Sequence, residues 1–300
     1  MSVNRHSPIL RIALLISVMA MSQACDKLGL GKSPTSPTGP PAPGATIVYT
    51  AVGASDANGV GSSVPCILFD PECANGMGYV PVAVRQLRTQ GFVVTMLNLG
   101  IPSAVIGRDF QTLGQQYNRV IAGNFIDQEM SFVQQNASLV TIFAGINEVN
   151  VVTAALGGGA GGSDPNAYMD AQVQAFGADY TTLLAGIRAR AGSPRFVLLN
   201  VPNAAGLPYL AGASLAQRQA AQRISVAMTK TVVDPLVSAN LIVVDLMCDP
   251  RTYVASNYFS DGLHPNDAGY AFIASEVVRA VTSASYPAPQ SSCSPMTIVP

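Results

Sequence analysis

Five short runs of mostly apolar residues constrain the fold of this chain more than any other feature. They are rich in valine, isoleucine and leucine and cover residues 46–52, 92–98, 139–144, 195–200 and 241–246. Strands that are buried on both faces have this composition, which is typical of parallel sheets covered by helices. The runs therefore predict a five-stranded parallel sheet.

Longer segments between and after the runs repeat apolar residues at helical spacing. These positions are Val173, Phe176, Tyr180, Leu183 and Ile187 in one segment, Ala221, Ile224, Met228 and Val232 in a second, and Tyr270, Ile273, Val277 and Val281 in a third. Ser214 and Asn266, which precede the second and third segments, are residue types that cap helices. The alternation predicts a three-layer α/β/α sandwich of flavodoxin-like type, in which sites form beyond the carboxyl ends of the strands.

The amino terminus has the pattern of an export signal. Two arginines flank a short polar start, an apolar run covers residues 12–21, and small residues lead to Ala24. The run, about ten residues long, is shorter than the roughly twenty that span a bilayer. The junction with Cys25 resembles the cleavage site of bacterial lipoproteins, whose cysteine is lipidated, although Ser22 replaces the usual larger aliphatic residue. We expect a signal peptide over 1–24 and a membrane-anchored envelope lipoprotein; a secreted or periplasmic protein is the alternative.

Residues 25–44 are expected to form a tether behind this anchor. Five prolines lie there among serine, threonine and glycine, a composition that cannot build a core. One domain over residues 45–288 and a C-terminal tail over 289–300 complete the expected organisation.

Four cysteines remain beyond Cys25, an even number that suits disulfides in an oxidising compartment. Proximity in the sequence suggests a Cys66–Cys73 pair, which leaves Cys248 and Cys293 to hold the tail. Three pairings are possible, and the sequence does not choose between them. Because no CxxC motif or histidine cluster accompanies these residues, no metal site is expected.

His264 is the histidine that a processed chain would retain, because the other of the two, His6, lies in the expected signal peptide. Imidazole is the side chain best suited to proton transfer near neutral pH. Asp261, three residues upstream, is placed to orient its ring.

Ser55 follows the first predicted strand in the sequence Gly53-Ala54-Ser55, where small neighbours let a substrate approach closely. Gly100 follows the second strand and Asn147 the third, so a backbone N–H and a side-chain amide are expected at the same edge. Acyl transfer needs such donors, because negative charge develops on the carbonyl oxygen of the substrate.

The composition argues against other classes of protein. Sixteen Lys and Arg residues balance 17 Asp and Glu residues, which leaves no basic field for nucleic acid. The glycine run over residues 157–162 lacks GxGxxG spacing and follows no predicted strand, so it indicates a loop rather than a nucleotide site. We expect no cofactor, and the sequence carries no signal for an oligomeric state.

Together these segments resemble the four sequence blocks of the SGNH, or GDSL-type, hydrolase family. The blocks appear in order as Gly53-Ala54-Ser55, Gly100, Gly145-Ile146-Asn147-Glu148 and Asp261-Gly262-Leu263-His264. They extend over nearly the whole expected domain, and the resemblance implies the SGNH hydrolase fold and an ester substrate.

The resemblance also implies a role for each matching residue. Ser55 would be the nucleophile, His264 the general base and then acid, and Asp261 its orienting partner. The oxyanion hole would combine the N–H groups of Ser55 and Gly100 with the amide of Asn147. The sequence departs from the usual family pattern at Ala54 and Glu148, where aspartate is usual; this puts local hydrogen bonding in doubt rather than the chemistry.

Apolar loop residues are the sequence's evidence on substrate. They are Ile67, Leu68, Phe69, Val105, Ile106, Val151, Val152 and Leu156. If they frame the site, they suit short- to medium-chain carboxylic or lipid esters; the alternative is that they pack the loops onto the body. A carbohydrate O-acetyl esterase and a non-catalytic envelope lipoprotein that binds a glycan or a lipid are the alternative functions.

Overall fold

The computed structural model describes residues 39–66 and 73–300. The expected signal peptide, the lipidation site at Cys25, most of the tether and residues 67–72 lie outside the described residues.

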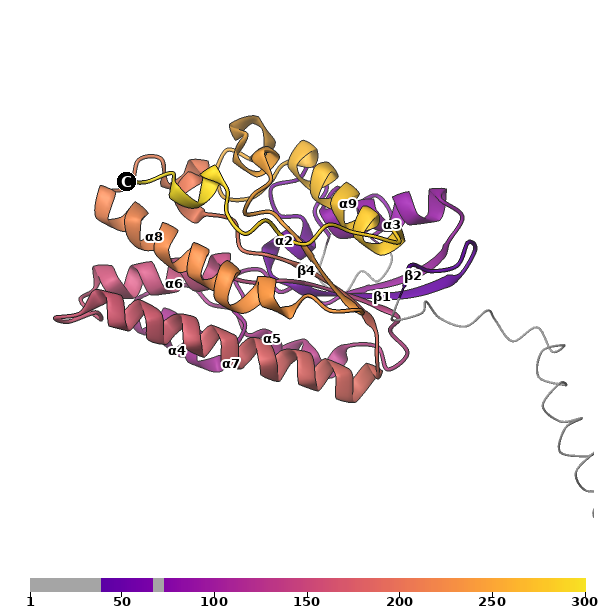
Figure 1. Cartoon of the computed structure of the whole chain (residues 1–300), viewed down its shortest axis with the longest axis horizontal. Coiled ribbons are helices and arrows are strands. Elements are labelled where there is room, and N and C mark those ends of the chain that lie inside the picture. The colour runs from indigo at the N-terminus through magenta and orange to yellow at the C-terminus, as the bar shows by residue number, and fades with distance from the viewer. Residues whose placement is uncertain (1–38, 67–72) are drawn as a thin grey trace, which may run out of the picture. The chain divides into compact units, whose positions relative to one another are not determined.

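A five-stranded parallel sheet forms the middle layer of the described domain (Figure 1). Its strands are β1 (Thr46–Gly53), β2 (Val93–Asn98), β3 (Leu139–Phe143), β4 (Arg195–Leu199) and β5 (Leu241–Val244). They lie in the order β2-β1-β3-β4-β5, and every neighbouring pair is parallel. The predicted fold class is therefore confirmed.

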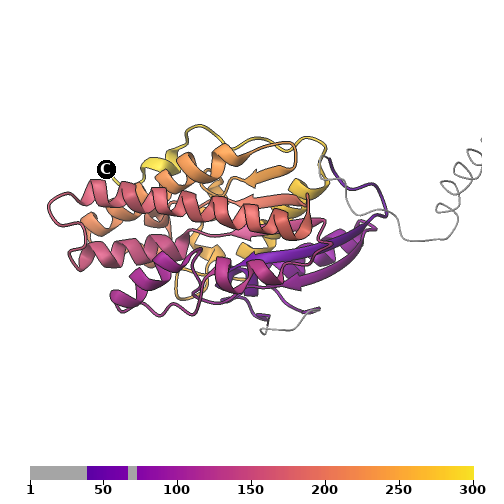
Figure 2. The ribbon, with the colours of Figure 1, turned by 90° about the horizontal axis from the view of Figure 1, so that it is seen from below.

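Helices cover both faces of the sheet (Figures 1 and 2). The α-helices are α2 (Ser55–Asn58), α3 (Tyr79–Thr89), α4 (Arg108–Gln116), α5 (Phe125–Gln128), α6 (Ile146–Gly157), α7 (Pro165–Ala191), α8 (Leu215–Ala227) and α9 (Asp267–Thr282). A π-helical segment, Met228–Val233, continues α8. Short 3₁₀ segments cover Met130–Phe132, Ala204–Gly206, Pro208–Leu210, Asp234–Leu236, Pro250–Tyr253, Ala255–Asn257 and Ser294–Thr297.

Two hydrophobic cores lie on opposite faces of the sheet. Strand β3 shows the alternation: Val140 and Ile142 join the core beneath α4–α8, whereas Leu139 and Phe143 join the core beneath α3 and α9. All five residues of β3 are buried. Burial on both faces explains why the inner strands form continuous apolar runs in the sequence, whereas Val93 and Thr95 of the edge strand β2 are exposed.

The predicted helix caps fix the ends of two helices. The Ser214 hydroxyl accepts the Gln217 N–H at 3.2 Å, and the Asn266 side chain accepts the N–H groups of Ala268 and Gly269. Because Asn266 lies two residues after His264, the cap of α9 also restrains the loop that carries the histidine.

The structure contains both disulfides suggested by sequence proximity. Cys66 pairs with Cys73 and Cys248 pairs with Cys293, with Cα–Cα distances of 5.6 and 5.7 Å. The second pair attaches the C-terminal segment to the end of β5. Within residues 39–66 and 73–300, no helix has the length and apolar character needed to cross a bilayer.

Candidate active site

Ser55 lies at the carboxyl end of β1, where the strand turns into the four-residue helix α2. The small residues Gly53 and Ala54 make this turn possible, because a Cβ at Gly53 would lie only 3.1 Å from Ala57. Ser55 is itself buried, with 8% of its surface exposed.

His264 contacts both of its expected partners. Its Nε2 lies 2.9 Å from Ser55 Oγ, across 209 positions of sequence, and its Nδ1 lies 2.6 Å from Asp261 Oδ2. The second oxygen of Asp261 accepts the backbone N–H groups of Leu263 and His264. The carboxylate is therefore fixed by three hydrogen bonds, and its position orients the imidazole.

These hydrogen bonds also decide the charge of Asp261. Partial burial on its own would raise the pKa of this carboxyl, but the hydrogen bonds from His264 and Leu263 outweigh it and hold the pKa below its usual value. Asp261 therefore stays ionised at neutral pH, as a partner of a protonated imidazole must.

The loop that carries His264 depends on Gly262. This residue has φ of 69°, and a Cβ there would lie 2.7 Å from the Tyr209 nitrogen. The Tyr209 N–H donates to Gly262 O at 3.0 Å, and the Phe259 N–H donates to His264 O at 2.9 Å. Only glycine combines this left-handed conformation with so close a neighbour.

Asn147 lies in the first turn of α6, directly beyond β3. Its Nδ2 donates to Ala104 O at 2.7 Å, and it lines the same pocket as Ser55 and His264. The preceding Gly145 has φ of 127°, and a Cβ there would overlap the Val201 side chain. The structure thus brings Asn147 to the serine and the histidine.

Gly100 is placed differently from what its expected role requires. Its N–H already donates to Asn98 Oδ1 at 3.1 Å, and its carbonyl accepts from Asn58 Nδ2 at 2.6 Å. A Cβ at Gly100 would lie 2.7 Å from Ala57 Cβ. The glycine therefore allows the loop after β2 to pack closely against α2, and in this conformation its N–H is bound by Asn98.

Two more carboxyls adjoin these residues, the half-buried Asp56 and the buried Glu148. Burial raises the pKa of Asp56, next to Ser55, although the neighbouring His264 opposes this effect. Burial also raises the pKa of Glu148 to about 7, against hydrogen bonds from backbone N–H groups that include Ile106. Asn147 and Glu148 together hold the loop over residues 104–106, one through a carbonyl and the other through an N–H.

An apolar pocket opens beside Ser55 and His264. Its apolar lining includes Phe143, Ile146, Leu207, Leu246, Phe272 and Ile273. The pocket has a volume of about 30 Å³, which is room for about two water molecules. A small apolar group fits this space.

Other apolar loop residues were candidates in the sequence for framing the site, and the structure places most of them in the core instead. Val105, Ile106, Val151 and Val152 are fully buried in the core beneath α4–α8, and Leu156 packs against it. They therefore pack the loops onto the body, which was the alternative. Ile67, Leu68 and Phe69 lie outside the described residues. The true lining comes from strand ends and α9, whose apolar positions have the same sequence pattern as core residues.

A serine, a histidine and an aspartate in hydrogen-bond contact at the carboxyl edge of a parallel α/β sandwich form the arrangement that serine hydrolases use. The model of the GDSL-like lipase/acylhydrolase family matches residues 51–272. The chain belongs to this family, which confirms the predicted resemblance.

Solved structures with a similar fold include two lipases. An extracellular lipase from Streptomyces rimosus is 16% identical, with a TM-score of 0.51 over 80% of this chain and 100% of that one. The lipase Lip_vut3 from a goat rumen metagenome is 18% identical, with a TM-score of 0.50 over 78% of this chain and 97% of that one. At these identities the likeness concerns the fold. A comparison with curated proteins gives no match.

Proposed function

We propose that this protein is a serine ester hydrolase that cleaves short-chain carboxylic esters through an acyl-serine intermediate. The observation that carries the proposal is the pair of contacts that His264 makes, with Ser55 at 2.9 Å and with Asp261 at 2.6 Å. Family membership supports ester hydrolysis as the reaction class.

In the proposed mechanism, Nε2 of His264 takes the proton of Ser55 as Oγ bonds to the acyl carbon, and the carbonyl electrons move onto oxygen. The imidazolium then gives this proton to the alcohol oxygen as the ester bond breaks. Water repeats both steps on the acyl-serine and releases the acid. The ionised Asp261 stabilises the imidazolium during each step.

The oxyanion that forms in each step needs hydrogen-bond donors. Asn147 uses its Nδ2 to hold Ala104 O, and the second hydrogen of the same nitrogen remains for the oxyanion. Ser103 supplies a backbone donor more readily than Gly100 does. Its N–H donates to no acceptor among the described residues, and the Ala104 carbonyl next to it is held by Asn147. Its φ of 62° belongs to the turn closed by the hydrogen bond from Ala104 N–H to Ile101 O.

The small pocket favours small acyl groups over long ones. A space for about two water molecules holds an acetyl or a similarly short group. This restricts the acyl side and leaves the alcohol open, so a carbohydrate O-acetyl esterase is the second candidate. Comparing p-nitrophenyl acetate, longer p-nitrophenyl esters and acetylated xylan as substrates separates these candidates.

The decisive test of the reaction class is labelling by a fluorophosphonate, which reacts with an activated serine. We expect labelling of the wild type and hydrolysis of p-nitrophenyl acetate, and loss of both in Ser55→Ala. Ser285→Ala, at an exposed serine far along the chain, is the matched control and should behave as the wild type does. An unlabelled wild type would instead favour the non-catalytic lipoprotein that binds a glycan or a lipid.

We further propose that the protein is exported and anchored through a lipidated Cys25. The amino-terminal sequence pattern supports this location, and so do the two disulfides, which persist in oxidising compartments.

A further inference from the structure

Phe272 connects the small pocket to a second hollow through its contact with Arg251. It lines the small pocket beside Ser55, and Arg251 lies against its ring with the guanidinium carbon 5.0 Å from the ring centre. Arg251 in turn lines a second hollow, which has a volume of about 440 Å³. The ring therefore lines the small pocket, and its contact with Arg251 links it to the residues of the larger hollow.

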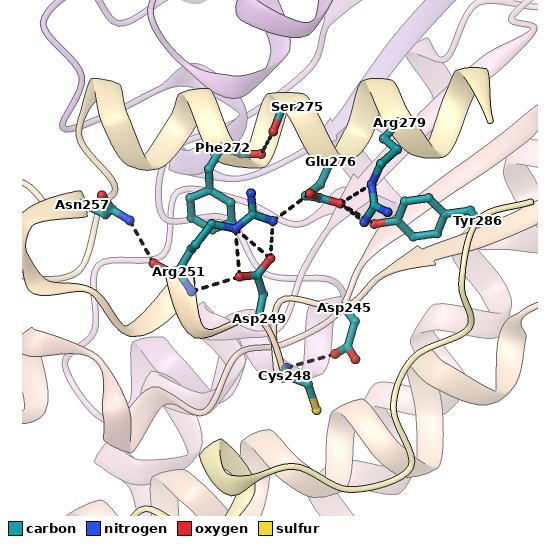
Figure 3. Close-up of polar contacts among 10 residues, drawn as sticks. All are labelled: Asp245, Cys248, Asp249, Arg251, Asn257, Phe272, Ser275, Glu276, Arg279 and Tyr286. Carbon is teal, nitrogen blue, oxygen red and sulfur yellow. Dashed lines mark hydrogen bonds and ion pairs between the residues drawn. The ribbon is translucent and has the colours of Figure 1, made fainter.

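Arg251 is held in place by two carboxylates (Figure 3). It makes a two-pronged contact with Asp249, with Nη2 2.5 Å from Oδ2 and Nε 3.0 Å from Oδ1, and its Nη2 also lies 2.7 Å from Glu276 Oε1. Glu276 lies one helical turn after Phe272 on α9. This clamp fixes the guanidinium over the ring, a favourable cation–π geometry.

The same arginine supports a second part of the pocket wall. Its main-chain carbonyl accepts from Asn257 Nδ2 at 2.9 Å, and Asn257 lines the small pocket. Arg251 therefore holds the wall at two points, and its hydrogen bonds and ion pairs with the described residues do not include Ser55 or His264.

We propose that Phe272, held by Arg251, ends the acyl pocket and sets the upper limit on the acyl chain that the enzyme accepts. The inference rests on the proposed ester hydrolysis and identifies Phe272 as a specificity-determining residue. When the ring is removed, the space that it fills joins the small pocket, and a longer chain gains contacts with the apolar residues that remain there, which include Leu246 and Ile273.

Arg279 provides a matched control for Arg251. It binds the same Glu276 from the same helix, but it lies over Tyr286, with its guanidinium carbon 4.7 Å from that ring centre (Figure 3). Tyr286 does not line the pocket beside Ser55. Loss of Arg279 therefore disturbs the charge cluster without releasing Phe272.

The test measures kcat/KM for p-nitrophenyl acetate, butyrate and octanoate, so that the acyl chain alone varies. In Phe272→Ala the octanoate-to-acetate ratio should rise about tenfold or more, since each newly buried methylene contributes about 0.8 kcal/mol. Arg251→Met should raise the ratio in the same direction by less, and Arg279→Met should leave it unchanged. An unchanged ratio in folded Phe272→Ala, or an equal rise in Arg279→Met, would overturn the proposal.

Two outcomes keep this inference apart from the proposed function. If the wild type hydrolyses no ester, the proposed esterase function is wrong. If it hydrolyses acetate and the octanoate-to-acetate ratio is the same in Phe272→Ala as in the wild type, only the role of Phe272 is wrong. Thermal unfolding shows whether each variant is folded. Should Phe272→Ala not fold, Phe272→Leu decides the question. Butyrate then takes the place of octanoate, because replacing phenylalanine by leucine frees less space than replacing it by alanine.

Discussion

Glu148 is a buried carboxyl whose ionisation should cost stability within the neutral pH range. Its pKa rises from 4.5 to about 7 because burial disfavours the charged form. The stability that this group contributes is fully present below about pH 4.5 and is lost as the pH rises through 7. In Glu148→Gln, whose amide oxygen can still accept the Ile106 N–H, we expect this loss to disappear. Between pH 5 and pH 8, the free energy of unfolding of the wild type should fall by up to about 3 kcal/mol more than that of Glu148→Gln.

Urea unfolding at pH 5 and pH 8 measures this difference. Asp127→Asn is the control, because hydrogen bonds from Asn124 and Arg108 lower the pKa of this exposed carboxyl. Its charge is complete at both pH values, so its removal should change both stabilities equally. Parallel pH dependence in the wild type and Glu148→Gln would show that Glu148 is not the titrating group.

At the scale of single residues, sequence was informative where chemistry restricts the choice. One retained histidine and an aspartate three positions before it left few alternatives, and the structure brings both to Ser55. Gly100 was harder, because sequence spacing does not show that Asn98 occupies its N–H. Phe272 was not foreseen, since a pocket wall and a core position have the same pattern on a helix.

The C-terminal segment is an element whose attachment the structure explains. Val299 is buried in the core beneath α4–α8, and its N–H and carbonyl both bond to the Gln222 side chain. The Cys248–Cys293 disulfide closes a separation of 45 residues, whereas Cys66–Cys73 closes 7. A longer closed loop removes more entropy from the unfolded chain. Replacing Cys248 and Cys293 by serine should therefore lower the free energy of unfolding by about 4 kcal/mol, and replacing Cys66 and Cys73 should lower it by about 2 kcal/mol.

Chemical unfolding of the two double-serine variants, Cys248→Ser with Cys293→Ser and Cys66→Ser with Cys73→Ser, tests this order. The pair at positions 66 and 73 serves as the internal comparison. A smaller loss for the 248–293 variant would mean that the hydrogen bonds of Gln222 and the burial of Val299 hold the segment without the disulfide.

Helices and strands with a regular burial pattern were the ones that the sequence predicted well. The strands matched the apolar runs to within two residues, and β1, β3 and β4 are buried on both faces. Helix α7 and the capped helices α8 and α9 also matched their apolar spacing. The four-residue helices α2 and α5 and the 3₁₀ segments have too few residues to show a period, and their shape follows from packing.

At the scale of the whole domain, strand order explains why the site forms where it does. The chain leaves β1 for β2 on one side and later returns to β3 on the other, so β1 and β3 are neighbours whose connections diverge. A crevice forms at such a point beyond the carboxyl ends of the strands. Ser55 follows β1 and Asn147 follows β3, and the loop before α9 brings His264 to the same place.

The proposed anchor makes the last prediction, which concerns the full chain rather than the catalytic domain. If Cys25 is lipidated, the wild type expressed in a bacterium that processes lipoproteins should incorporate labelled palmitate and sediment with membranes. Cys25→Ser should lose both properties, because acyl chains supply the apolar area that holds such a protein to a bilayer. Ester hydrolysis should be the same in both, since Cys25 precedes the domain that contains Ser55 and His264. A wild-type chain without label, or a label that survives in Cys25→Ser, would exclude this anchor and leave a secreted enzyme.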